Sequence, residues 1–199
     1  MPPKNKHLQN RVAPDGSLHA VPERGTLMGN RGGRFHRAGQ VLGRARWASH
    51  HWICCELHFK NRHHEPMGEG YTSLFFLDEV TALAAGHRPC FECRRAEARA
   101  MLGPLKADAF DRLLHAERLS PARMALPEDL PDGAMLQQDE RFWARRRGHF
   151  LRWSFAGYDA QVKIGADKPV RVLTPPTILS ILQKGYQPRW HASALTWDD

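Results

Sequence analysis

Residues 72–95 read TSLFFLDEVTALAAGHRPCFECRR, and the order of signals in this stretch decides the fold. Its first five residues, Thr72 to Phe76, are largely β-branched and aromatic, which predicts a buried strand. Asp78 stands where a helix N-cap belongs, ahead of apolar residues at helical spacing. Gly86 lies just past the helix, where a positive φ carries no steric cost for glycine, and Pro89 stops the helix from continuing. The stretch therefore predicts a strand, a short helix and a fixed path into the C-x-x-C that follows.

Cys90 and Cys93 form this C-x-x-C pair. Two thiols separated by two residues can both bind one tetrahedral metal ion, and the spacing recurs as half of a structural zinc site. The chain has four cysteines, and the other two are the neighbours Cys54 and Cys55. We find no signal-peptide pattern and expect a reducing compartment, which favours metal binding over disulfides. The pair is therefore the first half of a predicted zinc site.

The same stretch resembles a known family, the zinc-binding domain of the Ada type. The residues that carry the resemblance are Phe75-Phe76, Ala82-Leu83-Ala84-Ala85-Gly86 and Arg88-Pro89-Cys90-x-x-Cys93-Arg94, and it covers roughly residues 52–95. That domain forms the N-terminal part of bacterial regulators of DNA alkylation repair. The resemblance implies four zinc ligands, the first two separated by three residues, and DNA as a partner. In this sequence the implied ligands are Cys54, His58, Cys90 and Cys93, so one family cysteine is replaced by histidine.

The first ligand pair lies in a stretch that itself predicts a strand. Trp47 to Phe59 reads WASHHWICCELHF, with apolar side chains at alternate positions. In a regular strand Cys54 and His58 would lie about 13 Å apart, too far to share one zinc ion. Either the chain turns within residues 55–57, or one of the two is not a ligand. Cys55 is the replacement thiol if the alternation holds in another register.

Positive charge is concentrated in the first third of the chain. The sequence has 29 Lys and Arg against 21 Asp and Glu, a net charge of +8. Residues 1–62 contain 11 of the basic and 3 of the acidic residues, so this segment holds the whole excess. A localised basic region suits a polyanion, because each phosphate contact releases counterions. A solubilising surface is the alternative interpretation.

Four arginines are the predicted nucleic-acid contacts. Gly25 to Arg34 reads GTLMGNRGGR and predicts a loop whose backbone can approach a ligand closely. Successive amides with Arg31 and Arg34 would suit a phosphate, although the segment matches no standard nucleotide motif and a plain tight turn is the alternative. Arg94 and Arg95 put positive charge beside the cysteines, unless they are the solvated face of an ordinary helix.

A zinc-dependent nucleobase deaminase is the second interpretation of the metal motif. His63-x-Glu65 with Pro89-Cys90-x-x-Cys93 spells H-x-E…P-C-x-x-C, with His63 as ligand and Glu65 as proton shuttle. That site needs H-x-E on a helix, but the residues after Glu65 are Pro, Met and Gly, which form helices poorly. A solvated polar loop is the simpler alternative, and whether the chain is an enzyme stays open.

The rest of the chain predicts helices and then strands. Helices are expected over residues 94–102, 105–119 and 177–184, a proline-rich connector over 121–131, and strands over 134–138, 141–144, 150–155, 161–164 and 170–173. No apolar run reaches the roughly 18 residues of a membrane span, and we expect a cytoplasmic protein without a membrane partner.

Together these patterns predict an α+β fold of two regions. Residues 1–120 would form a basic N-terminal half with an Ada-like zinc knuckle, built as strand, helix and C-x-x-C. Residues 121–199 would form a β-rich half packed against it. The expected function is nucleic-acid binding, with DNA favoured, by a protein that holds a structural Zn²⁺ ion. The alternative is a zinc-dependent hydrolase or deaminase acting on a nucleobase or nucleotide.

Overall fold

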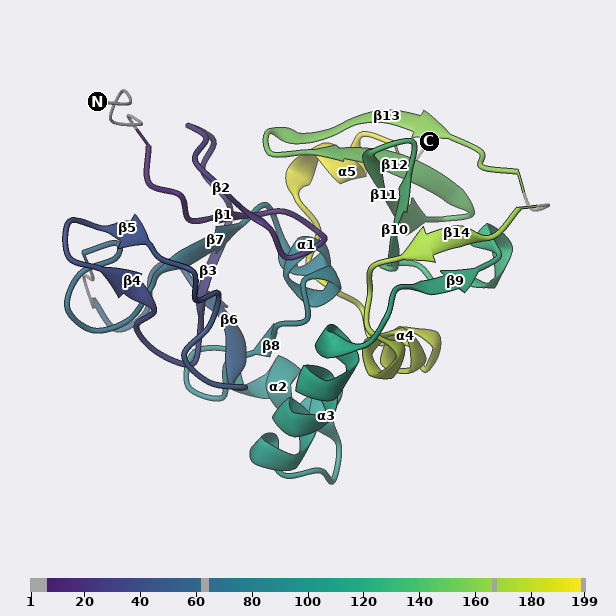
Figure 1. Ribbon diagram of the computed structural model, residues 1–199. Coiled ribbons are helices and arrows are strands. Elements are labelled where there is room, and N and C mark those ends of the chain that lie inside the picture. Colours follow the sequence, from purple (N-terminus) through teal and green to yellow (C-terminus); the bar gives the residue numbers. More distant parts are fainter. Residues whose placement is uncertain (1–6, 62–64, 166–167, 198–199) are drawn as a thin grey trace.

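The computed structural model describes residues 7–61, 65–165 and 168–197, whose strands form two six-stranded sheets and a small hairpin (Figure 1). The N-terminal sheet has the order β2-β1-β7-β3-β6-β8 and is mixed, because β1 pairs parallel to β7 and β6 parallel to β8. Its strands are β1 (Arg11–Val12), β2 (Leu18–His19), β3 (Leu27–Arg31), β6 (Trp52–Glu56), β7 (Leu74–Phe76) and β8 (Arg88–Pro89). The hairpin consists of β4 (His36–Arg37) and β5 (Val41–Leu42).

The C-terminal sheet has the order β13-β12-β11-β10-β14-β9, and each neighbouring pair is antiparallel. Its strands are β9 (Arg123–Ala125), β10 (Met135–Gln138), β11 (Arg141–Arg146), β12 (His149–Ser154), β13 (Gly157–Val162) and β14 (Val170–Val172). Asp139 and Glu140 connect β10 to β11 with φ values of 50° and 60°, as expected for a tight hairpin turn. Each strand predicted after Gly133 overlaps an observed one, so the β-rich C-terminal sheet is confirmed.

The helices are α1 (Glu79–Ala84), α2 (Arg95–Leu102), α3 (Ala107–Leu119), α4 (Pro176–Gln183) and α5 (Ala192–Leu195), with one 3₁₀ turn at Pro127–Asp129. In Figure 1 α1 lies between the two sheets, and α2, α3 and α4 lie below them. All six residues of α1 are buried. They join three hydrophobic clusters: Val80 with Met135 of the C-terminal sheet, Ala82 with Phe76 of the N-terminal sheet, and Leu83 with Phe110 of α3. The helix at the centre of the opening stretch is therefore shared by the cores of both halves.

The ends of α1 are built as the sequence predicts. Asp78 is the N-cap, and one of its carboxylate oxygens accepts hydrogen bonds from the Thr81 amide at 2.9 Å and hydroxyl at 2.8 Å. The other oxygen accepts from the Tyr158 hydroxyl and the His191 amide, both at 3.0 Å. Gly86 follows the helix with φ +78°. The Asp78 carboxylate therefore also connects the C-terminal sheet and the C-terminal segment to the start of α1.

The predicted fold class is wrong in its N-terminal half. The strand, helix and C-x-x-C do not form a small Ada-like knuckle, because β7 pairs with both β1 and β3 inside a six-stranded sheet. The basic first third supplies β1, β2, β3 and β6 of that sheet. Both halves of the chain are therefore rich in strands, and the α+β description with a single β-rich half does not fit.

Strand β3 explains why the sequence was misleading here. The loop predicted over Gly25–Arg34 contains this strand, whose buried face presents Leu27, Gly29 and Arg31. A Cβ on Gly29 would lie 2.1 Å from the carbonyl oxygen of Ile53, so the glycine allows close strand packing instead of a turn. A glycine and an arginine on the buried face hide the apolar alternation that would have indicated a strand.

No helix among the described residues is long and apolar enough to cross a membrane.

Most of the helices pack at one end of the molecule, where α2, α3 and α4 share one hydrophobic cluster. The fold therefore positions the C-x-x-C at the junction between the N-terminal sheet and this helical layer.

Candidate metal centre

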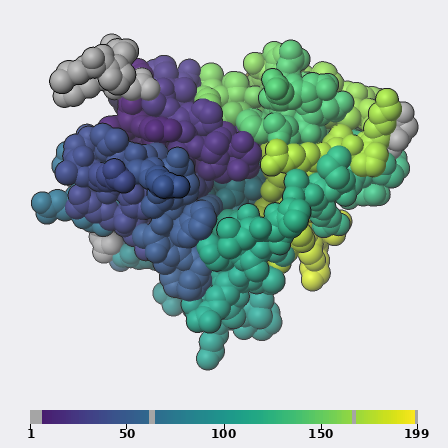
Figure 2. All heavy atoms as spheres, in the orientation of Figure 1, coloured from purple at the N-terminus to yellow at the C-terminus, as the bar shows by residue number. Residues whose placement is uncertain are grey.

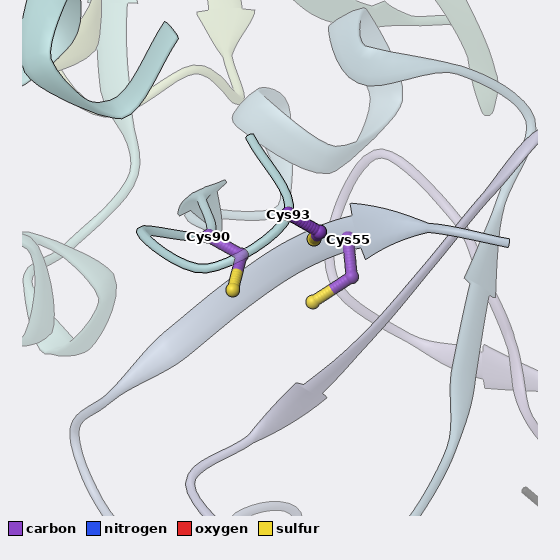
Figure 3. A group of neighbouring side chains, drawn as sticks. All are labelled: Cys55, Cys90 and Cys93. Carbon is purple, nitrogen blue, oxygen red and sulfur yellow. The ribbon is translucent and has the colours of Figure 1, made fainter. Parts of the chain in front are cut away.

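Three cysteine side chains converge beside β6 (Figure 3). Cys55 lies on β6, whereas Cys90 and Cys93 lie in the turn between β8 and α2. Their sulfur atoms all lie within 4.8 Å of one another, so the group can hold a metal ion. Zinc bound at Zn–S distances of about 2.3 Å would bring tetrahedral sulfurs to about 3.8 Å, which small side-chain rotations achieve.

The pairing of β6 with β8 brings these thiols together. Cys54 is in register with Pro89, and the Cys90 amide donates to the Cys54 carbonyl at 3.0 Å. The C-x-x-C turn therefore begins directly beside β6. Since side chains alternate along a strand, Cys55 and Cys54 point to opposite faces, and Cys55 is the one that meets Cys90 and Cys93.

The local hydrogen bonds favour thiolates. The Glu92 amide donates to Cys90 Sγ at 3.3 Å, and the Glu56 amide donates to Cys93 Sγ at 3.4 Å. Hydrogen bonds with Cys55 and Cys93 lower the pKa of Cys90. Hydrogen bonds with Cys90 and Cys93 raise the pKa of Cys55, and the hydrogen bond with Cys90 and burial raise the pKa of Cys93 despite the opposing effect of Cys55. The thiolate is the form that binds a metal ion, so metal binding at this group would displace the protons that the three thiols share.

Cys54 and His58, predicted as the first ligand pair, are not brought to the cluster. Cys54 is fully buried in the core, where its sulfur accepts a hydrogen bond from Arg94 at 3.3 Å and burial raises its pKa to about 12. His58 is exposed beyond the end of β6 and belongs to neither of the candidate metal groups found in the described part of the chain. Strand alternation is the reason, and Cys55 takes the place of Cys54.

Glu56 and Tyr71 lie beside the thiols, and no sequence pattern predicted their proximity. The Glu56 carboxylate forms two hydrogen bonds with Arg189, at 2.9 and 2.7 Å, which lower its pKa. Burial, followed by the charges of the three cysteines, raises the pKa of Tyr71, so its phenol lies within their electrostatic field. No local sequence pattern marks Tyr71, which follows a glycine. None marks Glu56, because its partner Arg189 lies 133 residues away in the sequence.

The four predicted nucleic-acid contacts divide into two buried and two exposed arginines. Arg94 has a side chain 1% exposed and pairs with the equally buried Glu79 at 2.8 Å, so it faces the interior. Arg31 is also buried, and its guanidinium lies 4.0 Å from the Trp52 ring centroid. Arg34 and Arg95 are exposed. Among the four, Arg34 and Arg95 can reach a ligand on the open surface.

The deaminase motif is not assembled in the described residues. His63 lies outside them. Glu65 is in a turn region rather than a helix, and its carboxylate accepts from the Gln40 side chain at 3.3 Å, between β4 and β5. Glu65 is also not part of the thiol group. Within the described residues, Glu65 therefore lacks the helical context that a deaminase shuttle requires.

A second group that can hold a metal ion, which no sequence motif indicates, consists of His50, His51 and Asp108. One Asp108 oxygen contacts His50 at 2.9 Å, and the other pairs with Arg112 at 2.9 Å. His51 bonds through Nδ1 to Asp111 at 2.8 Å. These hydrogen bonds connect the segment before β6 to α3.

His87 is a buried histidine that contacts Arg31. Its Nε2 accepts a hydrogen bond from Arg31 Nε at 3.3 Å, and its ring packs on Trp52 and Phe76. Burial, reinforced by the charges of Arg31 and Arg118, lowers the pKa of His87 well below 6.5. The ring is therefore neutral in the folded protein, whereas unfolding restores its ordinary affinity for protons.

We expect the free energy of unfolding to fall as the pH drops below 6.5, the ordinary value for His87. The unfolded chain then binds more protons than the folded one, and the slope from this residue is up to about 1.4 kcal/mol per pH unit. Urea unfolding over this pH range measures the slope. His87→Gln keeps an acceptor for Arg31 but does not titrate, so it should show a shallower slope; equal slopes would rule the assignment out.

Comparisons of this chain with protein-family models, curated proteins and solved structures find no match. Its function is therefore inferred from its own residues. The thiol cluster and the distribution of unpaired arginines are the features that carry chemical information.

Proposed function

We propose that this protein binds zinc through Cys55, Cys90 and Cys93 and binds nucleic acid, DNA in the first instance, through its basic N-terminal half. The zinc ion is structural in this proposal. It links β6 to the turn before α2, two segments 35 residues apart in sequence. Strand β8, which leads into this turn, has two residues and lies at the edge of its sheet, so it has few backbone contacts of its own.

Zinc is the metal that fits the ligand set best. Three thiolates form a soft site, and thiolate sites select zinc, copper(I) or iron–sulfur clusters over magnesium or calcium. A C-x-x-C with a third cysteine on a neighbouring strand supplies three of the four ligands that a tetrahedral structural zinc site uses. Amide hydrogen bonds to two of the sulfurs support the same assignment, because they orient and stabilise the thiolates.

The observation that carries the nucleic-acid proposal is a set of exposed arginines without acidic partners. Residues 34–46, which we call the arginine hairpin, contain β4 and β5 with Arg34, Arg37, Arg44 and Arg46. All four are exposed, and none forms an ion pair with a carboxylate in the described regions. No Asp or Glu occurs between Gly25 and Cys55. Unpaired guanidinium groups at this density favour phosphate contacts.

Salt-dependent DNA binding tests this part of the proposal. We expect duplex DNA to bind with an affinity that falls as salt rises, with a slope of about 0.9 per phosphate contact. Arg34→Ala/Arg44→Ala removes two charges from the arginine hairpin and should reduce that slope by about 1.8. Fluorescence anisotropy with a labelled duplex at several salt concentrations measures it.

The matched control is Arg99→Ala/Arg141→Ala, which removes two exposed arginines elsewhere. It changes net charge equally but leaves the arginine hairpin intact, so its slope should remain that of the wild type. Equal losses in the two double variants would mean that net charge alone drives binding, and the arginine hairpin would not be the interface. Absence of measurable binding in the wild type would end the nucleic-acid proposal and leave the zinc proposal standing.

A further inference from the structure

A crevice of about 470 Å³ lies where the two halves of the chain meet. Its walls come from the β1–β2 turn, the end of β3, the segment before β6, the end of α3 and the β14–α4 connection. In Figure 2 the purple N-terminal segment, the teal α3 region and the yellow-green β14–α4 region adjoin on the face shown. The volume is in the range of small-molecule sites.

Arginines dominate the charged lining of this crevice. Five guanidinium groups face two carboxylates, and the arginines are Arg31, Arg46, Arg118, Arg123 and Arg171. Both carboxylates are already engaged by neutral donors. Asp15 accepts from the amide and hydroxyl of Ser17, and Glu117 accepts from the amide and hydroxyl of Thr177. The crevice therefore has a net positive charge that its own acids do not neutralise.

The two least exposed arginines of the crevice, Arg31 and Arg118, form no ion pair with a carboxylate of the described residues. Arg31 is 2% exposed and donates to His87, to the Arg46 carbonyl at 3.3 Å and to the Gly16 carbonyl at 2.8 Å. Arg118 donates to the Gly86 and His50 carbonyls, and its Nε is buried without a partner among the described residues. Neutral acceptors offset only part of the cost of burying two cations.

These two cations also repel each other. Both guanidinium groups stack on Trp52, at 4.0 and 4.1 Å from its ring centroid. Burial, with the nearby charges of Arg118 and Arg46, lowers the pKa of Arg31 to about 9, and burial lowers the pKa of Arg118 to about 10. An anion in the crevice would relieve this repulsion, and a phosphate accepts from several guanidinium groups at once.

An aromatic surface lies beside the cationic one. Trp47 also lines the crevice and is 39% exposed, although its ring packs against Trp52 at 5.9 Å and His115 at 5.7 Å. A partly exposed indole held in place by neighbouring rings provides a surface for stacking a planar group. A nucleobase attached to a phosphate matches both surfaces.

We infer that the crevice binds a nucleoside monophosphate unit, with the phosphate directed to Arg31 and Arg118 and the base against Trp47. Arg123 and Arg171, which are exposed at the same crevice, attract the anion and complete its contacts. The unit is either a free nucleotide or the phosphorylated end of a nucleic-acid strand. The second source rests on the proposed nucleic-acid function, whereas the first does not.

Calorimetry with the full chain tests this inference by comparing AMP with adenosine. We expect AMP to bind at least about tenfold more tightly than adenosine, because the nucleoside has no phosphate. Trp47→Ala should weaken AMP binding about tenfold but leave inorganic phosphate binding unchanged. Arg123→Ala/Arg171→Ala should weaken both AMP and phosphate, whereas Arg99→Ala/Arg141→Ala should weaken neither. These four arginines are exposed, so the double variants should fold.

Equal binding of AMP and adenosine, or equal losses in the two double variants, would overturn the inference. So would unchanged AMP affinity in Trp47→Ala. A single-stranded oligonucleotide with and without a 5′-phosphate separates the two sources: preference for the phosphorylated end favours the strand, and tight AMP binding without that preference favours the free nucleotide. Arg34→Ala/Arg44→Ala should leave AMP binding unchanged, so failure of the crevice and failure of the arginine hairpin are distinguishable.

Discussion

Replacing Cys55 with serine should lower the free energy of unfolding by several kcal/mol and make it insensitive to chelators. The substitution removes the ligand that joins β6 to the C-x-x-C turn, so the stability contributed by the metal is lost. The loss should stay below the roughly 10–16 kcal/mol that zinc contributes to isolated zinc-finger peptides, because the core around α1 remains. Chemical unfolding with and without EDTA measures both effects.

The neighbouring thiol supplies the matched control. Cys54→Ala removes a buried sulfur from the other face of the same strand, with an expected cost of about 1–2 kcal/mol from lost packing. Its unfolding should remain sensitive to EDTA, as in the wild type. If Cys54→Ala abolished the chelator effect and Cys55→Ser preserved it, the assignment of ligands would be reversed.

The second large effect is expected at the ion pair of Arg94 with Glu79. Both side chains are 1% exposed, and the carboxylate also accepts from the Tyr186 hydroxyl at 2.7 Å and the Arg189 amide at 2.8 Å. Arg94→Met would leave a buried carboxylate without its cation, and removing one partner of a buried pair costs about 3–5 kcal/mol. Thermal and urea unfolding of the variant measure the loss.

A double substitution separates this pair from the metal site next to it. Arg94→Met/Glu79→Gln removes both charges and should recover part of the lost stability, because no buried charge is left unpaired. Both variants should retain zinc, since neither residue is a ligand. A double variant no more stable than Arg94→Met alone would show that the charge of Glu79 is not the cause of the loss.

Local signals made the opening stretch predictable. The Asp78 cap, the strand before it and the Gly86 turn each depend on a few consecutive residues, and the structure has all three. The same holds for the C-terminal strands, whose turns fall at glycines and acidic residues with positive φ. Short-range patterns of this kind need no knowledge of distant partners.

The features that the sequence did not predict depend on contacts between distant segments. Whether Cys54 or Cys55 joins Cys90 is decided by which face of β6 meets the turn after β8, and strand alternation alone does not specify the face. Arg31 looked like a surface residue because its buried partners, Trp52 and His87, lie 21 and 56 residues away in the sequence. The sheet of the N-terminal half was missed for the same reason.

The zinc content of the purified wild type, Cys54→Ala and Cys55→Ser proteins shows whether Cys55 is a zinc ligand. We expect a single zinc ion per chain in the wild type and in Cys54→Ala, and none in Cys55→Ser, since the sulfur of Cys55 lies with those of Cys90 and Cys93. Loss of zinc from Cys54→Ala with retention in Cys55→Ser, or a wild-type protein that binds no zinc, would contradict the assignment of Cys55, Cys90 and Cys93 as zinc ligands.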